Sequence, residues 1–483
     1  MLYVKQQILA FIFLFPVFGG LYSWSYSYNS FDSRLYHTGY GKTDMGRTRL
    51  DSLKSSISSS DKENDGFQFI HSFQTGGAFF SQKGGDRRRD EAEKYGMRGQ
   101  GNLELAIALE KEDIETYLLL SPISIYKEDY HRQKNIEKLK DLEAIFGFKI
   151  KNAPNFILET GRGFQRLDSF GLMFAGKANF VEFKWRVGEF SPLISLTGIQ
   201  YNRKEELHIK QEPEYGILKG GSLNFLYIPN IYNFRIFYYE NNEKLLIAKK
   251  KTFFEEEREF SPKAYFRYAG GEIFTKDILS IFKLQAGLFY ISGFKDYREK
   301  ATEPVNKKGT VAGLIYAQLI MSQLPLKFGF LRSSKDREER VGRRDNAYSP
   351  ILADPSIFGG RASFLLMQNI NMDNPAVFTD LNTYRNSTYT NAGMQISHIE
   401  YRYKLLSYFS VAFLLNYGFS ELGKGGEFIF SLYSSLPRNS LSFLLLSYTT
   451  AFIKNSESYG YFLEDKSRSK EYKRIFFSAG VSF

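Results

Sequence analysis

Apolar and polar residues alternate along most of this chain. From about residue 66 to the last residue, short segments place large apolar side chains at every second position and polar or small side chains between them. The pattern is clearest in residues 103–110, 144–151, 181–188, 232–238 and 409–418. A two-residue period puts one apolar row on one face of a β-strand. The sequence therefore predicts an all-β fold of amphipathic strands.

The length of these segments favours a membrane protein over a soluble sheet. They run about 9–12 residues, longer than the ~5–6 common in globular strands and suited to crossing a bilayer at a tilt. Short connections lie at residues 188–192 and just before Leu326, whereas long, charged ones lie at residues 84–95, 127–141, 241–259, 296–308 and 333–346. Tight turns at one end and long loops at the other are typical of a transmembrane antiparallel β-barrel, and about eighteen strands fit residues 66–483.

The N-terminus predicts export. Lys5 precedes an apolar run from Ile8 to Phe18 that Pro16 interrupts, followed by small residues, so residues 1–23 resemble a signal peptide. The alternative, an uncleaved anchor, needs ~20 apolar residues, which this run does not supply. Residues 24–65 are polar and rich in serine, and such a composition cannot bury a core. We expect them to form a short periplasmic or loosely ordered leader.

The C-terminal strand gives the sharpest single signal. Phe477, Val481 and the terminal Phe483 belong to one apolar row, with small or polar residues between them. A final strand of this kind resembles the assembly signal of bacterial outer-membrane barrels, and it implies the barrel-assembly machinery and outer-membrane lipid as partners. The alternative is the closing strand of a soluble β-protein. Together with the signal peptide, the strand predicts location in the bacterial outer membrane.

Composition excludes several kinds of chemistry. The chain has no cysteine and five histidines, so it offers no disulfide, thiolate metal site or cysteine nucleophile. Mean hydropathy is −0.33, which a barrel tolerates because only alternate strand residues face lipid. His398 could be the base of a surface hydrolase, but the sequence places no serine or aspartate partner beside it. We expect no enzyme, no cofactor, no metal and no nucleic-acid partner.

Charge suggests which solutes a barrel would pass. The chain has 64 Lys and Arg against 53 Asp and Glu, a formal net charge of +11. A cationic lumen would concentrate anions and offer bidentate donors to carboxylates or phosphates. The alternative is that these cations only pair with glutamates across the interior. The polar strand faces predict these lumen-facing cations: Lys149, Lys184, Arg186, Arg235, Arg267 and Arg402.

Two stretches resemble the alginate-export family of outer-membrane barrels. One is residues 161–172, with Arg162, Arg166 and Asp168 before an alternating strand, and the other includes Glu427 and residues 444–452. Ile429 stands where an acidic residue is expected. The resemblance implies an 18-stranded barrel whose electropositive constriction passes an acidic polysaccharide or small anions. It also implies that Arg162, Arg166 and Asp168 line that constriction, although a salt-bridged turn would explain them equally well.

These features predict a passive outer-membrane channel, porin-like or exporter-like, for small or polymeric anionic solutes such as acidic sugars. The alternative is a surface adhesin or structural barrel that acts through its long charged loops. A receptor with a folded plug is disfavoured, because 483 residues are few for a large barrel and a plug together.

Overall fold

The computed structural model describes the strands of this chain, their short turns and parts of two loops. The described residues are 66–83, 93–128, 137–150, 155–188, 191–202, 215–225, 231–244, 263–276, 278, 281–297, 306–334, 344–345, 348, 351, 355, 357–366, 393–406, 409–420, 423–436, 441–455 and 469–482. The predicted signal peptide and leader lie outside them, as does Phe483. Within these ranges, no helix is long and apolar enough to span a membrane.

In the described residues, nineteen strands form one sheet. In chain order they are β1 (Gly66–Lys83), β2 (Glu93–Lys111), β3 (Ile114–Glu128), β4 (Glu137–Ile150), β5 (Asn155–Arg166), β6 (Ala175–Arg186), β7 (Leu193–Asn202), β8 (Tyr215–Phe225), β9 (Ile231–Lys244), β10 (Lys263–Thr275), β11 (Phe282–Tyr297), β12 (Asn306–Met321), β13 (Leu326–Ser333), β14 (Arg344–Asp345), β15 (Gln395–Leu406), β16 (Phe409–Ser420), β17 (Gly423–Leu436), β18 (Leu441–Asn455) and β19 (Ser469–Ser482). A 3-10 turn, η1 (Gly360–Ala362), lies between β14 and β15.

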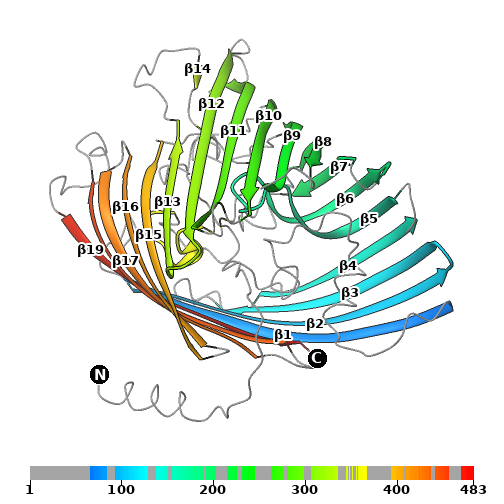
Figure 1. The fold of residues 1–483 in the computed structure, drawn as a ribbon, viewed down its shortest axis with the longest axis horizontal. Coiled ribbons are helices and arrows are strands. Elements are labelled where there is room, and N and C mark those ends of the chain that lie inside the picture. Colours follow the sequence, from blue (N-terminus) through cyan, green and yellow to red (C-terminus); the bar gives the residue numbers. More distant parts are fainter. Residues whose placement is uncertain are drawn as a thin grey trace, which may run out of the picture.

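The sheet closes on itself (Figure 1). Each strand pairs antiparallel with the next, β13 pairs with β15, and β19 returns to pair with β1 through residues 74–83. The two-residue β14 stands apart because it only adds a parallel bridge to β12. The other eighteen strands complete the ring, which confirms the predicted all-β barrel and its strand count.

The two faces of the strands differ as the sequence predicted. On β16, Phe413, Leu415 and Tyr417 are 40%, 54% and 54% exposed on the outer face, whereas the intervening Leu414 and Asn416 are buried inside. The same alternation recurs on other strands. Apolar side chains left exposed around a closed sheet suit contact with lipid rather than water. The outer face is therefore the membrane-facing surface.

The inner face is more apolar than the sequence pattern indicated. Tyr117, Tyr201, Phe266, Phe289 and Tyr316 all point inward and are fully buried. The middle strands, such as β9 and β12, carry large apolar residues on both faces. An inward aromatic surface must be covered by other apolar groups to stay out of water. Loops that fold into the barrel provide part of this cover.

Connections at the two ends of the barrel differ in length. At one end the turns are short, as between Lys111 and Ile114 or between Met321 and Leu326. At the other end they are mostly long, and the longest runs from Ser333 to Gln395. We call these the turn end and the long-loop end. In outer-membrane barrels the long loops face the cell exterior.

Candidate functional site: two loops inside the barrel

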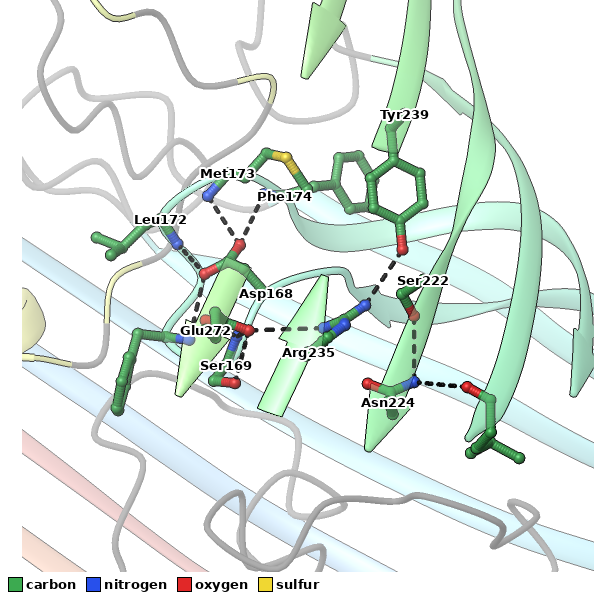
Figure 2. A network of polar contacts seen from close by, with 12 residues as sticks. Asp168, Ser169, Leu172, Met173, Phe174, Ser222, Asn224, Arg235, Tyr239 and Glu272 are labelled. Atoms are coloured by element: carbon green, nitrogen blue, oxygen red, sulfur yellow. Dashed lines mark hydrogen bonds and ion pairs between the residues drawn. The ribbon is translucent and has the colours of Figure 1, made fainter. Parts of the chain in front are cut away.

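The β5–β6 connection, residues 167–174, folds into the barrel, and we call it the first inner loop. Its centre is the buried carboxylate of Asp168 (Figure 2). The carboxylate accepts hydrogen bonds from four backbone N–H groups, at 3.2 Å from Phe170, 2.6 Å from Leu172, 2.8 Å from Met173 and 3.2 Å from Phe174. Gly171, at φ 67°, supplies the left-handed bend that this wrapping needs. Asp168 therefore shapes the loop from within.

The first inner loop docks on the inner wall through Glu272 of β10 (Figure 2). The Ser169 backbone N–H and hydroxyl donate to the Glu272 carboxylate, each at 3.0 Å. The Tyr316 hydroxyl donates to it at 3.1 Å, and an Arg235 nitrogen lies 3.7 Å from it. Phe170 packs edge-on against the Tyr316 ring, with ring centres 5.1 Å apart. One buried carboxylate thus joins a loop to three strands of the wall.

A polar track continues from this anchor along the inner wall of β8 and β9 (Figure 2). Arg235 donates to the Tyr239 hydroxyl at 3.2 Å. Nearby, the Asn224 amide donates to the Ser222 hydroxyl at 3.2 Å. The side chains of Ser222, Asn224 and Tyr239 are buried, so these hydrogen bonds stabilise the wall beside the first inner loop.

Residues 357–366, which we call the second inner loop, dock on the opposite set of strands through Glu427 of β17. The Glu427 carboxylate accepts from the Ser363 hydroxyl, from the backbone N–H of Phe364 at 2.7 Å and Leu365 at 3.2 Å, and from the Asn416 amide at 2.6 Å. Hydrogen bonds to a charged acceptor are stronger than those between neutral groups. Glu427 is therefore the main polar anchor of this loop.

Further wall residues hold the same loop. Arg474 of β19 donates to the Ser363 carbonyl at 2.9 Å, and its guanidinium lies 4.0 Å from the centre of the Phe364 ring. Thr449 of β18 donates to the Ala362 carbonyl at 2.7 Å. Gly359 sits at φ 92°, where a Cβ atom would come within 2.5 Å of an Ile429 methyl. The loop is fastened along β17–β19 by both polar and apolar contacts.

The histidine singled out from the sequence belongs to this docking surface. The His398 ring stacks on Phe358, with ring centres 4.6 Å apart, and its Nδ1 lies 2.6 Å from the Asn416 side-chain oxygen. The Asn416 amide donates to the Phe358 carbonyl at 2.9 Å. His398 therefore packs against the second inner loop.

The first inner loop is also bound to the chain leading into the second one. The Tyr348 hydroxyl donates to the Leu172 carbonyl at 3.3 Å, and the Ile351 N–H donates to the Met173 carbonyl at 3.0 Å. Burial raises the pKa of Tyr348 well above its ordinary value, with Asp168 as a secondary cause, so the hydroxyl stays protonated and able to donate. The two loops are thus linked inside the barrel.

Among the described residues, the ion pairs at Glu400 and Glu272 expose the cation to water and bury the carboxylate. Around Glu400, which is 3% exposed, Lys327 is 24% exposed and Arg402 is 28% exposed, at 2.9 Å and 2.6 Å from it. Arg235 is 16% exposed against 0% for Glu272. The pair of Lys184 and Glu182 is different, because the lysine side chain is 11% exposed and the glutamate side chain 18%. The Lys184 ammonium lies 3.0 Å from the Glu182 carboxylate.

The structure places five of the predicted cations on lumen-facing rows, but it does not gather them into one cluster. Lys149 pairs across strands with Glu115, whose side chain is buried inside. Arg186, at the end of β6, donates to the Gly188 carbonyl at 3.0 Å. The other three, described above, are Lys184, Arg235 and Arg402.

Two predicted lumen cations lie elsewhere, which corrects the expectation. Arg267 is exposed on the outer face, because its neighbours Phe266 and Tyr268 take the inward positions of β10. Arg162 pairs with Asn179, a residue of the outward row of β6. Arg166 is half-buried at the end of β5, next to the first inner loop.

The residues of the C-terminal strand lie at the seam of the barrel. Phe477 pairs with Phe79 of β1 and Leu446 of β18, on the outward row that includes Ile475. Val481 pairs with Thr75 of β1. Phe483 lies outside the described residues.

The sequence did not reveal that Glu272, Glu427 and Ser363 anchor loops, or that the two loops turn inward. One signal was present, a mostly apolar stretch at residues 357–366 inside a long connection rich in charged and polar residues. Exposing such a stretch to water is unfavourable, so its presence in a long surface loop indicates a segment that docks on the protein.

A closed antiparallel barrel with an exposed apolar outer face and loops folded into its lumen is a bacterial outer-membrane β-barrel. Comparison with solved structures finds similar chains. OccK5 (OpdH) of Pseudomonas aeruginosa superposes with a TM-score of 0.51 and 11% identity, covering 86% of this chain and 98% of that one. OpdQ of the same species superposes with a TM-score of 0.49 and 10% identity, covering 86% of this chain and 99% of that one. The outer membrane protein opdK, also from that species, superposes with a TM-score of 0.47 and 9% identity, covering 86% of this chain and 99% of that one.

The sequence itself matches no family model and no curated protein. The structural likeness to OccK5 supports the barrel fold, and the likeness to the alginate-export family stays a resemblance of short motifs. The fold and its membrane-facing surface place the chain in the bacterial outer membrane.

Proposed function

We propose that this barrel is a passive outer-membrane channel for small anionic solutes, such as acidic sugars. The observation that carries the proposal is the arrangement of the lumen ion pairs. At Glu400 and at Glu272, the carboxylate is buried in the wall while its cationic partners reach water. A solute in the lumen therefore meets guanidinium and ammonium groups before it meets carboxylates, and a low-dielectric wall strengthens that field.

The inner loops support a preference for small solutes. They fill part of the lumen with buried apolar side chains and are joined to each other through Tyr348 and Ile351. A narrowed passage brings a solute close to the wall, where charge and hydrogen bonding determine selectivity. We infer that acidic sugars pass as short units beside Arg235, whose side chain is 16% exposed.

Ion selectivity in a planar bilayer tests the proposal. Refolded mature protein should give stable conductance steps and a reversal potential that favours chloride in a potassium chloride gradient. The double variant Lys327→Gln, Arg402→Gln removes two solvent-reaching lumen cations, so its chloride preference should fall. Lys473→Gln is the matched control, because this lysine is 48% exposed, on the outer face of β19.

Three results would contradict the proposal: cation preference in the unaltered protein, an unchanged reversal potential in the double variant, or an equal loss in the Lys473 control. A folded barrel without any conductance would instead favour the adhesin alternative, which acts through the long loops. Uronic acid oligomers, added as blockers, then test the proposed class of solute in the conducting protein.

A further inference from the structure

A polar patch interrupts the membrane-facing surface on β8, β9 and β10. Lys219, Glu240 and Arg267 stand directly opposite one another on these three neighbouring strands. Two tyrosines on the same outer face, Tyr238 and Tyr265, flank this row. We call these five residues the outer patch.

The contacts within the outer patch leave an excess of positive charge. The Lys219 ammonium lies 3.6 Å from the Glu240 carboxylate, which also accepts from the Tyr238 hydroxyl at 3.1 Å. Arg267 donates to the Tyr265 hydroxyl at 3.0 Å, and its guanidinium lies 5.2 Å from the centre of that ring. One carboxylate thus faces two cations. The Lys219 side chain is 64% exposed and is available to an outside group.

The position of the outer patch fits the boundary between the hydrocarbon core and the lipid headgroups. Lys219 and Arg267 lie near the first residues of β8 and β10, and Glu240 lies near the last residues of β9, all at the long-loop end. Nearer the turn end on the outer face of β9, the residue is Ile236, 40% exposed. Tyrosines at such a boundary are typical of the aromatic girdle of a barrel.

The surroundings leave room for a headgroup. Gly198 of β7 stands opposite Lys219, and a Cβ atom added there would meet nothing within 4 Å. A phosphate group suits two cations and a phenol hydroxyl, because it offers several strong acceptor oxygens and negative charge. The lipid at the exterior side of a bacterial outer membrane is a glycolipid that bears phosphates on its sugar headgroup.

We propose that the outer patch binds the phosphorylated glycolipid of the outer leaflet, with Lys219 and Arg267 holding a headgroup phosphate. Glu240 keeps the two cations in place between their strands, and Tyr265 stacks beneath the guanidinium. This site faces away from the lumen and does not depend on the proposed channel function.

Retention of lipid by the refolded full-length barrel tests this site. The probes are diphosphoryl lipid A and phosphatidylglycerol in the same detergent, with bound lipid measured by native mass spectrometry. Each cation near a membrane surface contributes about a fivefold gain in binding to anionic lipid. The double variant Lys219→Gln, Arg267→Gln should therefore hold lipid A about 25-fold more weakly, and Arg267→Gln alone about fivefold more weakly.

Lys473→Gln is again the control, because Lys473 lies on the outer face of the same end but is paired one to one with Glu471 at 3.0 Å. It should retain lipid A like the unaltered protein. Heat-modifiable migration in a gel verifies that each variant is folded. If the double variant does not fold, Arg267→Gln alone tests the site. Equal retention by the patch variants, or equal binding of phosphatidylglycerol, would overturn the proposal.

Discussion

Replacing Glu427 by glutamine should release the second inner loop from the barrel wall. The carboxylate accepts hydrogen bonds from Ser363, Phe364, Leu365 and Asn416, and two of these reach its Oε2 atom. Glutamine keeps one acceptor oxygen and presents an NH2 group to the remaining donors. A hydrogen bond to a charged group contributes about 1.5–3 kcal/mol, so losing two costs at least about 3 kcal/mol. That value raises the undocked population about 150-fold.

Limited proteolysis measures this undocking. The peptide bond after Arg361 lies in the second inner loop, whose described side chains are buried, so trypsin should cut the folded unaltered protein slowly there. Glu427→Gln should be cut far faster at that bond, and its single-channel conductance should rise because the lumen is less filled. Glu471→Gln is the control, because this carboxylate is 45% exposed on the outer face.

The reasoning fails if folded Glu427→Gln protein is cut after Arg361 at the rate of the unaltered protein and conducts equally. Glu427 would then not be the main polar anchor, and the loop would be held by its apolar contacts alone. Faster cutting of the Glu471 control would show that the assay reports general loosening of the barrel.

Two further substitutions separate the contributions to the inner loops. Asp168→Asn replaces one carboxylate oxygen by NH2, so two of the four backbone N–H groups, the pair bound to that oxygen, lose their acceptor. We expect the first inner loop to loosen by about 1–3 kcal/mol and single-channel current noise to increase. Unchanged noise in a folded variant would contradict this. Arg474→Met loses the hydrogen bond to the Ser363 carbonyl and the contact with the Phe364 ring, so trypsin should cut the second inner loop faster. Cleavage at the rate of the unaltered protein would show that Arg474 stabilises only the wall.

The barrel was predictable from the sequence because its signal is local and repeated. Each strand shows its outward row by alternation, as Phe413 and Leu415 do on β16, and the number of such segments sets the strand count. The facing of Arg267 was not predictable in the same way. It lies between Phe266 and Tyr268, and a strand that is apolar on both faces does not reveal which row faces lipid.

The candidate site depends on contacts that alternation does not encode. Glu272 and Glu427 look like ordinary lumen glutamates, and only the folded chain shows that loops distant in sequence supply their donors. Ser169 and Glu272 are 103 residues apart, and Ser363 and Glu427 are 64 apart. The mostly apolar stretch at residues 357–366 is the one local feature that indicated a docked loop.

The pairing of β1 with β19 has a consequence for the order of assembly. Residues 74–83 pair with residues 473–482, so closure of the barrel joins the two ends of the described chain. These contacts have a very large sequence separation, which makes them slow to form. Arg474 lies on β19 and donates a hydrogen bond to the Ser363 carbonyl of the second inner loop. Because β19 also pairs with β18, the strands that hold the second inner loop, β15–β19, all lie on one side of this seam. An open intermediate therefore already has the docking surface, and narrowing of the lumen does not require closure of the wall.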